Sequence, residues 1–194
     1  MAPVSPSLTP LLTPLMTRVM AASLLLLLLL LAACNPVFNW REVRPDNTAL
    51  SLLLPCKPDK AQRSVPLGGR PTELAMLGCD AGDATFAVAV ATLDDAAQAA
   101  AVLAGWQTAT LANLKAAGGG QTSPLKLSGA DLLPPAVLVR ASGQRADGRA
   151  VQSQAAYFSQ GRQVFQAVIY ANQMDPEVAD TFFSSLKLDA GTPR

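Results

Sequence analysis

The sequence contains no histidine, and this absence limits the chemistry that the chain can perform. Histidine is the usual general base of serine and cysteine hydrolases and the most common metal ligand. We therefore expect no catalytic residues, no metal site and no cofactor. An excess of one charge sign is missing too, because 15 lysine and arginine residues are balanced by 14 acidic ones. Nucleic acid is therefore not expected as a partner, since binding to phosphates needs a basic surface.

Long apolar runs are also missing, with one exception near the start of the chain. The run from Val19 to Ala33 has 15 residues and includes eight consecutive leucines. A helix needs about 20 apolar residues to span a bilayer, so this run is short for a membrane span. A basic residue, an apolar block and small residues at the end are the parts of a secretory signal. The run predicts a signal peptide with Met16 or Met20 as its true start, and an uncleaved anchor helix is the alternative.

The apolar run ends in Leu-Ala-Ala-Cys at residues 31–34, which resembles the lipobox of bacterial lipoproteins. The resemblance implies that Cys34 carries lipid and that the chain is cleaved in front of it. Several acyl chains hold a soluble domain durably on a bilayer, because each buried methylene contributes about 0.8 kcal/mol. In this family, an aspartate after the lipidated cysteine commonly retains the protein in the inner membrane. Asn35 stands there instead, which implies the periplasmic face of the outer membrane, with the inner membrane as the alternative.

The lipobox also divides the chain into segments. We expect a signal peptide at residues 1–33, a lipidated leader or tether at 34–48 and a single domain at 49–190. The leader contains Phe38 and Trp40, so its end is expected to pack on the domain as an edge strand at residues 40–44. The domain is long enough to form one hydrophobic core of its own.

Two cysteines, Cys56 and Cys79, remain once Cys34 takes lipid. An even pair in an oxidising compartment predicts a disulfide bond, which would staple two strand ends together at an edge of the sheet. Closing a separation of 23 residues stabilises a fold by roughly 3 kcal/mol in the chain-entropy model. Free thiols or a redox-active pair are the alternative, although redox cysteines are more typically two residues apart.

Apolar and alternating runs predict a domain rich in strands. The expected strands are 49–54, 62–67, 73–79, 84–93, 125–127, 136–145, 149–158 and 163–171. Those at 84–93 and 163–171 are mostly apolar on both sides, so we expect them near the centre of a sheet that is covered on both faces.

Two helices are expected, one central and one near the end of the chain. Asp94 and Asp95 open a long alanine-rich helix, and the glycines at 118–120 are expected to end it. The sequence Asp-Pro-Glu at residues 175–177 is typical of a helix start, and Phe182 belongs to the buried face of the helix that follows. The order of elements predicts an α+β fold, in which a long central helix and a C-terminal helix pack on a largely antiparallel sheet.

This arrangement resembles the PsbP/Mog1-like fold, which includes bacterial lipoproteins. The segments that carry the resemblance are SLLLPCKP at 51–58, FAVAVATL at 86–93 and the stretch from Gly148 to Leu188. The resemblance implies a binding or assembly factor without a shared catalytic set, and therefore a protein that is not an enzyme. The cysteine pair is not a feature that this fold requires.

These observations favour a membrane-anchored, periplasm-facing lipoprotein that acts as a non-catalytic binding or envelope-assembly module. Its partner would be an unknown envelope protein. One alternative is a carrier of a lipid or small apolar ligand in a pocket between sheet and helix. The four side chains that could line this pocket are Trp106, Phe158, Phe165 and Phe182. Another alternative is an enzyme or redox factor that uses the cysteine pair or the acidic pair Asp80 and Asp83, although such acidic residues are more typical of a turn.

Overall fold

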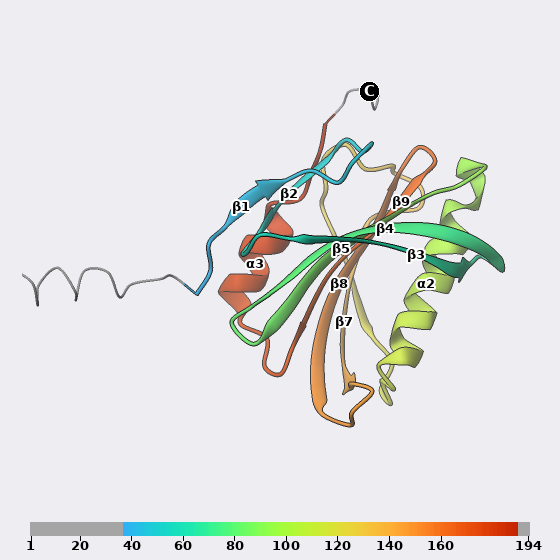
Figure 1. Cartoon of the computed structure of the whole chain (residues 1–194). Coiled ribbons are helices and arrows are strands. Elements are labelled where there is room, and N and C mark those ends of the chain that lie inside the picture. Colours follow the sequence, from blue (N-terminus) through green and yellow to red (C-terminus); the bar gives the residue numbers. More distant parts are fainter. Residues whose placement is uncertain (1–36, 190–194) are drawn as a thin grey trace, which may run out of the picture. The chain divides into compact units, whose positions relative to one another are not determined.

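The computed structural model describes residues 37–189, which contain two β-sheets and two α-helices (Figure 1). The chain divides between Val37 and Phe38, and the residues from Phe38 onward form one folded unit. Every pair of neighbouring strands in the described part is antiparallel. The predicted α+β fold is therefore confirmed.

The larger sheet has the strand order β3-β4-β5-β9-β8-β7-β6. Its strands are β3 (Asp59–Leu67), β4 (Arg70–Ala81), β5 (Ala84–Thr92), β6 (Gln121–Pro124), β7 (Val137–Gln144), β8 (Ala150–Gln160) and β9 (Gln163–Ala171). Three of the connections are tight two-residue turns, because a two-residue hairpin suits the twist of antiparallel strands. The long crossover from β5 to β6 lets β9 pair with β5 along its whole length.

Helix α2 (Ala99–Asn113) lies on one face of this sheet and follows a short 3₁₀ turn, η1 (Ala96–Gln98) (Figure 1). The Asp95 carboxylate begins the turn by accepting a hydrogen bond of 2.9 Å from the Ala97 amide. The expectation that the glycines at 118–120 end the helix is wrong. Lys115 already has a φ of 51°, so the chain leaves the helical conformation before it reaches them.

The opposite face of the sheet carries helix α3 (Pro176–Ser184) and a second, three-stranded sheet. The strands of this small sheet are β1 (Arg41–Val43), β2 (Leu50–Leu54) and β10 (Lys187–Leu188), with β2 in the middle. The Asp175 carboxylate caps α3 by accepting hydrogen bonds from the amides of Glu177 and Val178. The predicted C-terminal helix start is therefore confirmed.

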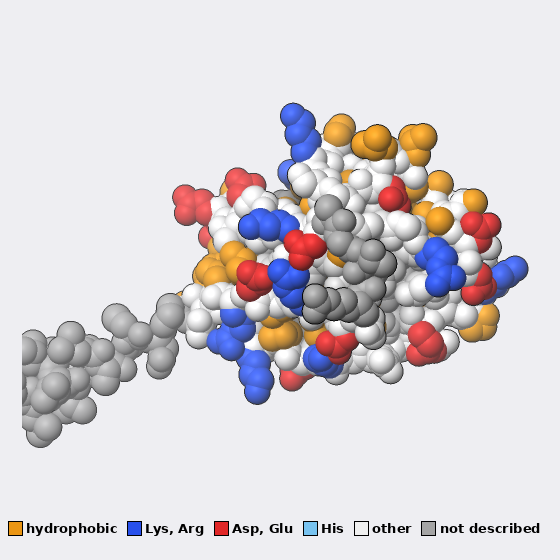
Figure 2. All heavy atoms as spheres, turned by 90° about the horizontal axis from the view of Figure 1, so that it is seen from above, with side chains coloured by type: hydrophobic (Ala, Val, Ile, Leu, Met, Phe, Trp, Pro, Cys, Tyr) orange, Lys and Arg blue, Asp and Glu red, His pale blue; other side chains and the backbone are white. Residues whose placement is uncertain are grey.

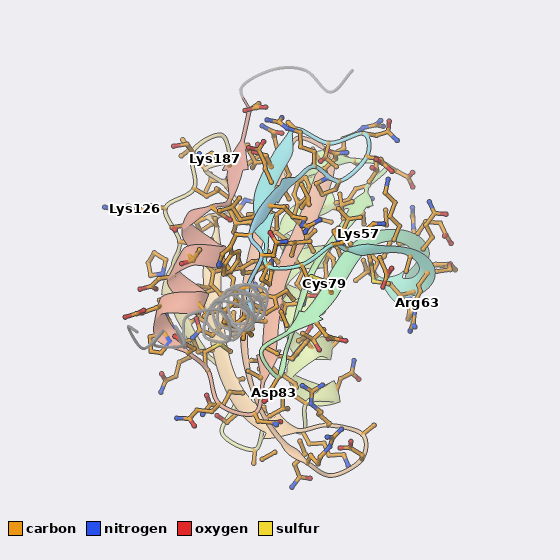
Figure 3. All side chains as sticks on the ribbon, turned by 60° about the vertical axis from the view of Figure 1, so that its left-hand side comes forward. Lys57, Arg63, Cys79, Asp83, Lys126 and Lys187 are labelled. Carbon is orange, nitrogen blue, oxygen red and sulfur yellow. A yellow bond between two sulfur atoms is a disulfide. The ribbon has the colours of Figure 1, made fainter. Side chains whose placement is uncertain are left out.

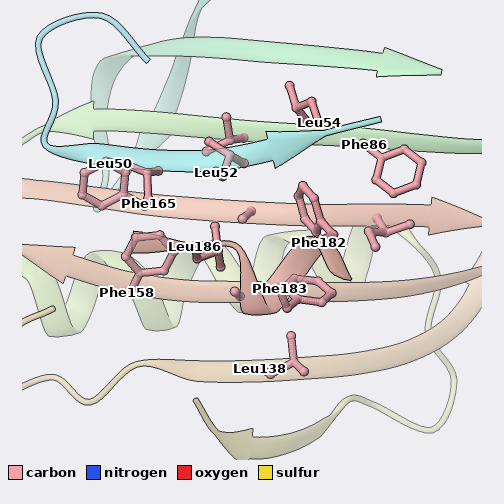
Figure 4. Close-up of a cluster of buried hydrophobic side chains, with 14 of the residues drawn as sticks. Leu50, Leu52, Leu54, Phe86, Leu138, Phe158, Phe165, Phe182, Phe183 and Leu186 are labelled. Atoms are coloured by element: carbon pink, nitrogen blue, oxygen red, sulfur yellow. The ribbon is translucent and has the colours of Figure 1, made fainter. Parts of the chain in front are cut away.

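Alternate side chains of the central strands enter two separate hydrophobic clusters. Phe86, which is fully buried on β5, packs in the cluster with β2 and α3 that Figure 4 shows. Its neighbour on the same strand, Ala87, packs against the cluster beneath α2. This alternation explains why the sequences of β5 and β9 are apolar on both sides, and it confirms their expected central position.

Two expectations about local structure need correction or refinement. No strand forms at 125–127, where one was expected; β6 instead spans Gln121–Pro124 and pairs with β7. This edge strand is short and mostly exposed, so its sequence lacks the apolar alternation that reveals buried strands. The end of the predicted leader does pack on the domain, because β1 pairs with β2 and the Trp40 ring lies 6.1 Å from that of Phe86.

Candidate functional site

The two cysteines that sequence reasoning paired are joined by a disulfide bond, with their Cα atoms 6.0 Å apart. Cys56 lies two residues after the end of β2, and Cys79 lies two residues before the end of β4. The bond continues the β3–β4 ladder, whose last pair is Asp59 with Gly78. The bond therefore attaches the segment between β2 of the small sheet and β3 of the large sheet to strand β4, which is consistent with a structural role.

The lipidation residue, Cys34, lies outside the described residues, and so does the whole predicted signal peptide. The described part begins at Val37, whose side chain is exposed, and Phe38 follows with its ring 6.4 Å from that of Phe86. None of the helices in residues 37–189 is long and apolar enough to cross a membrane.

The acidic pair Asp80 and Asp83 belongs to the β4–β5 hairpin. Gly82 and Asp83 form its two-residue turn, with φ angles of 57° and 60°. The Asp80 carboxylate accepts a hydrogen bond of 2.7 Å from the hydroxyl of Thr85 across the turn. Both acids thus serve the turn, as the sequence pattern indicated. No group of three or more Cys, Asp or Glu side chains that could hold a metal ion occurs within the described ranges.

The four aromatic residues proposed for a ligand pocket do not surround a common cavity. Phe158 and Phe165 stack with their ring centroids 5.0 Å apart, and both are fully buried with Phe182 in the cluster beside α3 (Figure 4). Trp106 lies on the opposite face of the sheet, where its ring is 6.4 Å from that of Tyr157. All four side chains are core residues that fill the space between the layers.

Three buried residues with polar groups, Gln166, Thr110 and Tyr157, form a small network between α2 and the sheet. The Gln166 amide nitrogen donates hydrogen bonds to the hydroxyls of Tyr157 and Thr110, at 2.9 and 3.0 Å. Burial raises the pKa of Tyr157, and burial together with the nearby Tyr157 raises the pKa of Tyr170 to about 12. Within residues 37–189, no buried side-chain nitrogen or oxygen lacks a hydrogen-bond partner, so this network has no open position for a ligand.

The charged groups are spread over the surface in small pairs of opposite sign. Figure 2 shows both signs mixed over one face of the molecule. Arg149 donates to the Asp147 carboxylate at 2.7 Å and lowers the pKa of that group. Arg44 donates to Asp189, and this hydrogen bond raises the pKa of the guanidinium. No patch of a single sign is visible on this face, so nothing there favours a strongly charged ligand.

A groove of about 550 Å³ lies between the tip of the β3–β4 hairpin and the start of α2. Its wall includes Arg70 and Asp94, whose charged atoms are 3.4 Å apart and exposed. The other polar side chains along it are exposed or half-buried. A ligand pocket normally excludes water around a few placed polar groups, and this open groove does not.

The feature that sequence reasoning missed is an exposed apolar loop. Leu132 and Leu133 are 89% and 86% exposed, and they are the two most exposed large hydrophobic residues in the described part. Sequence reasoning drew nothing from these two leucines. The available signal was a leucine pair between an aspartate and two prolines, because these flanking residues are typical of a loop rather than of a strand or helix.

The backbone before the two leucines is held firmly on the domain. The amide of Asp131 donates to the carbonyl of Ser159 at 2.8 Å, and the Ser159 hydroxyl donates to the Asp131 carboxylate at 3.0 Å. The Gln160 side chain donates to the carbonyl of Gly129. Gly129 has a φ of 84°, and a Cβ atom there would collide with the backbone oxygen of Leu188. The loop thus presents the leucines from a fixed position.

The leucine loop and the entry of the chain lie at different ends of the sheet. Phe38 packs on Phe86, which pairs with Ile169 on β9, whereas Ser159 beside the loop pairs with Val164. Five residues along a strand correspond to about 16 Å. The loop is therefore displaced along the strands from the end at which the chain enters the domain.

Comparisons with known proteins assign neither a family nor a function. No protein-family model matches the chain. No curated protein matches it either. Among solved structures, the chain is similar to the crystal structure of PA94, a protein of unknown function from Pseudomonas aeruginosa. The two share 18% identity, with 69% of this chain and 83% of that chain covered, at a TM-score of 0.32. At this TM-score, the similarity supports no statement about function.

Proposed function

We propose that the protein is a lipoprotein of the bacterial envelope, and that its domain is a non-catalytic module that binds another envelope protein. The observation that carries this proposal is the sequence Leu-Ala-Ala-Cys at residues 31–34, at the end of a signal-like apolar run. The disulfide between Cys56 and Cys79 supports it, because such bonds persist in oxidising compartments such as the periplasm. Asn35 favours the outer membrane within this proposal.

The binding surface that we propose is the leucine loop, and the partner is a protein with an apolar pocket. Two adjacent, almost fully exposed leucines on a firmly held backbone lose little conformational freedom on binding. Burying both side chains removes apolar surface from water, which contributes roughly 1.5–3 kcal/mol for each leucine. A lipid on Cys34 would hold the other end of the domain at the membrane, which leaves this loop accessible to proteins.

The anchor is tested by Cys34→Ser in the full chain, with metabolic palmitate labelling as the readout. The parent is expected to carry the label and to fractionate with membranes, and its mature form is expected to begin at residue 34. Cys34→Ser is expected to lose the label and the cleavage. A labelled Cys34→Ser variant, or an unlabelled parent, would contradict the lipoprotein assignment.

The binding surface is tested by cross-linking in intact cells, followed by purification of the protein under denaturing conditions. The double variant Leu132→Ser/Leu133→Ser is expected to lose a cross-linked species that the parent forms. Val37→Ser is the matched control, because Val37 is also an exposed apolar residue, at 66%, but lies near the entry of the chain. If the control loses the species equally, or the double variant keeps it, the leucine loop is not the binding surface. A lipid found bound by native mass spectrometry would favour the carrier alternative.

A further inference from the structure

Strand β3 forms an open edge of the large sheet. It stands at the end of the strand order, and none of the described residues pairs with its outer side. Its first six residues, Asp59 to Ser64, are all exposed. Figure 3 shows this hairpin projecting at the side of the molecule, with Arg63 near its outer limit. An exposed edge of this kind offers backbone hydrogen-bonding groups to another strand.

The register of the hairpin identifies which backbone groups point outward. Pro66 lies opposite Pro71, and neither has an amide hydrogen to donate. That pair must therefore be a non-hydrogen-bonded pair, and such pairs alternate with hydrogen-bonded pairs along an antiparallel ladder. The same alternation makes Ser64, Gln62 and Lys60 non-hydrogen-bonded toward β4. Their amides and carbonyls consequently face the open edge.

Two prolines limit this open edge, and they do so symmetrically. Pro66 occupies the next outward position after Ser64, and Pro58 the one before Lys60. Each proline is four residues from Gln62. The outward amides are therefore confined to a short window whose centre is Gln62.

We propose that β3 pairs with β3 of a second copy of this chain, antiparallel and centred on Gln62. Gln62 then lies opposite Gln62 of the second copy, and Lys60 lies opposite Ser64 of the second copy. Both are hydrogen-bonded pairs, as the outward direction of these backbone groups requires. The prolines of the two copies fall opposite each other and end the ladder, so the contact closes on itself about a two-fold axis.

The charges on β3 fit this pairing. Arg63 and Asp59 lie on the same face of the strand, and neither has an ionic partner within 4.0 Å among the described residues. In the proposed register, Arg63 lies opposite Ala61 of the second copy and diagonal both to its Asp59 and to its Arg63. Diagonal side chains on one face of a sheet are within reach of a long arginine. The two-fold axis creates the attractive contact between Arg63 and Asp59 twice and the repulsive contact between the two Arg63 side chains once, so the attractive contacts outnumber the repulsive one.

Disulfide cross-linking of the full chain in detergent tests the register. The Cα atoms of a hydrogen-bonded antiparallel pair are about 5.5 Å apart, which is within the range that a disulfide bridges. Gln62→Cys is therefore expected to form a covalent dimer under mild oxidation. Ser64→Cys is the matched control on the same edge, because the two introduced cysteines would be about 13 Å apart along the strands. The parent chain gives the background.

We expect about tenfold more dimer from Gln62→Cys than from Ser64→Cys, because only the first pair meets the geometric requirement. Equal dimer from both, no dimer above the parent, or a cross-link to a different protein would each overturn the proposal. Analytical ultracentrifugation supplies a second readout that needs no cysteine. Gln62→Pro removes an outward amide without removing a bond to β4, so it is expected to give a monomer, whereas Gln62→Thr is expected to remain dimeric.

The charge contact is tested on the same instrument with Arg63→Asp, which places like charges next to each other and is expected to weaken the dimer. The swap Asp59→Arg/Arg63→Asp restores opposite charges and is expected to recover it. A thermal melt of each variant confirms that the domain is folded. A parent that is a monomer at all concentrations, or a swap that recovers nothing, would overturn the proposal. None of these measurements depends on the lipid anchor.

Discussion

The side-chain amide of Gln166 on β9 donates a hydrogen bond of 3.0 Å to the hydroxyl of Thr110 on α2. Both residues are buried, and the same amide also donates to Tyr157. This contact is the polar connection between the helix and the sheet, in an interface that is otherwise apolar. The hydrogen bond fixes the position of α2, because a shift of the helix would leave buried polar groups without partners. Such a loss costs more free energy than a rearrangement of apolar contacts.

Replacing Gln166 tests this relationship. Gln166→Leu leaves the two hydroxyls without their donor in a buried site, and it is expected to lower the free energy of unfolding by about 1–3 kcal/mol. In the double variant Gln166→Leu/Thr110→Val, one of these unpaired groups is gone, so the total loss is expected to be smaller than the sum of the two single losses. Urea denaturation measures all three values. Strict additivity would contradict a coupled pair.

The disulfide between Cys56 and Cys79 is expected to stabilise the folded domain, because it closes a loop and so restricts the conformations of the unfolded chain. The double variant Cys56→Ala/Cys79→Ala is expected to lose roughly 3 kcal/mol of unfolding free energy, because the unfolded chain gains the freedom of the opened loop. Denaturant titration of the parent and the variant measures the difference. A thiol assay before reduction should find neither cysteine reactive; two reactive thiols would favour the redox alternative.

The raised pKa values of the tyrosines predict a loss of stability at high pH. An unfolded tyrosine titrates near pH 10, whereas Tyr170 in the folded domain titrates at about 12. Between these two values the unfolded chain binds fewer protons than the folded one, so the free energy of unfolding falls as the pH rises. The loss from Tyr170 amounts to about 3 kcal/mol at most.

Absorbance at 295 nm follows the formation of tyrosinate. The chain has two tyrosines, and both are expected to titrate late when the domain is folded and near pH 10 after denaturation. Tyr170→Phe is expected to flatten the decline of stability above pH 10. Ionisation of either tyrosine near pH 10 in the folded parent would contradict the burial seen in the structure. The Tyr170→Phe variant would then identify which of the two tyrosines it is.

Substituting two glycines with similar φ angles distinguishes the cost of backbone strain from the cost of a steric clash. Gly129 and Gly148 have φ angles of 84° and 85°, but only at Gly129 would a Cβ atom meet a neighbour, the backbone oxygen of Leu188. Gly148→Ala is expected to cost about 1 kcal/mol, the usual penalty for a positive φ. Gly129→Ala adds the conflict with β10 and is expected to cost more, of the order of 1–3 kcal/mol in addition. Thermal unfolding of both variants measures the difference, and equal losses would contradict it.

The sequence by itself determined the local elements and the pairing of the cysteines. The predicted strand at 163–171 has the bounds of β9, and the Asp-Pro-Glu start gave α3 its correct N-terminus. These features depend on nearest neighbours, on side-chain alternation and on helix capping, all of which can be read within a few residues. The disulfide followed from counting, because only two cysteines remained for the domain.

Local patterns failed where the segment was exposed. Strand β6 and the first residues of β3 carry polar side chains on both faces, so no alternation marked them. The end of α2 at Asn113, just before the positive φ of Lys115, was missed because glycines follow closely and are the more usual end signal. In each case, the conformation depends on pairing or packing with distant residues rather than on the segment itself.

Only the tertiary structure decided the arrangement on which the proposals depend. It placed β9 beside β5, put Trp106 and the phenylalanines on opposite faces, left β3 at an open edge and exposed Leu132 with Leu133. These outcomes follow from contacts between residues far apart in the chain, whose free energies depend on the whole packed core. A sequence pattern records which residues prefer burial, and the fold then decides which of them remain available to a partner.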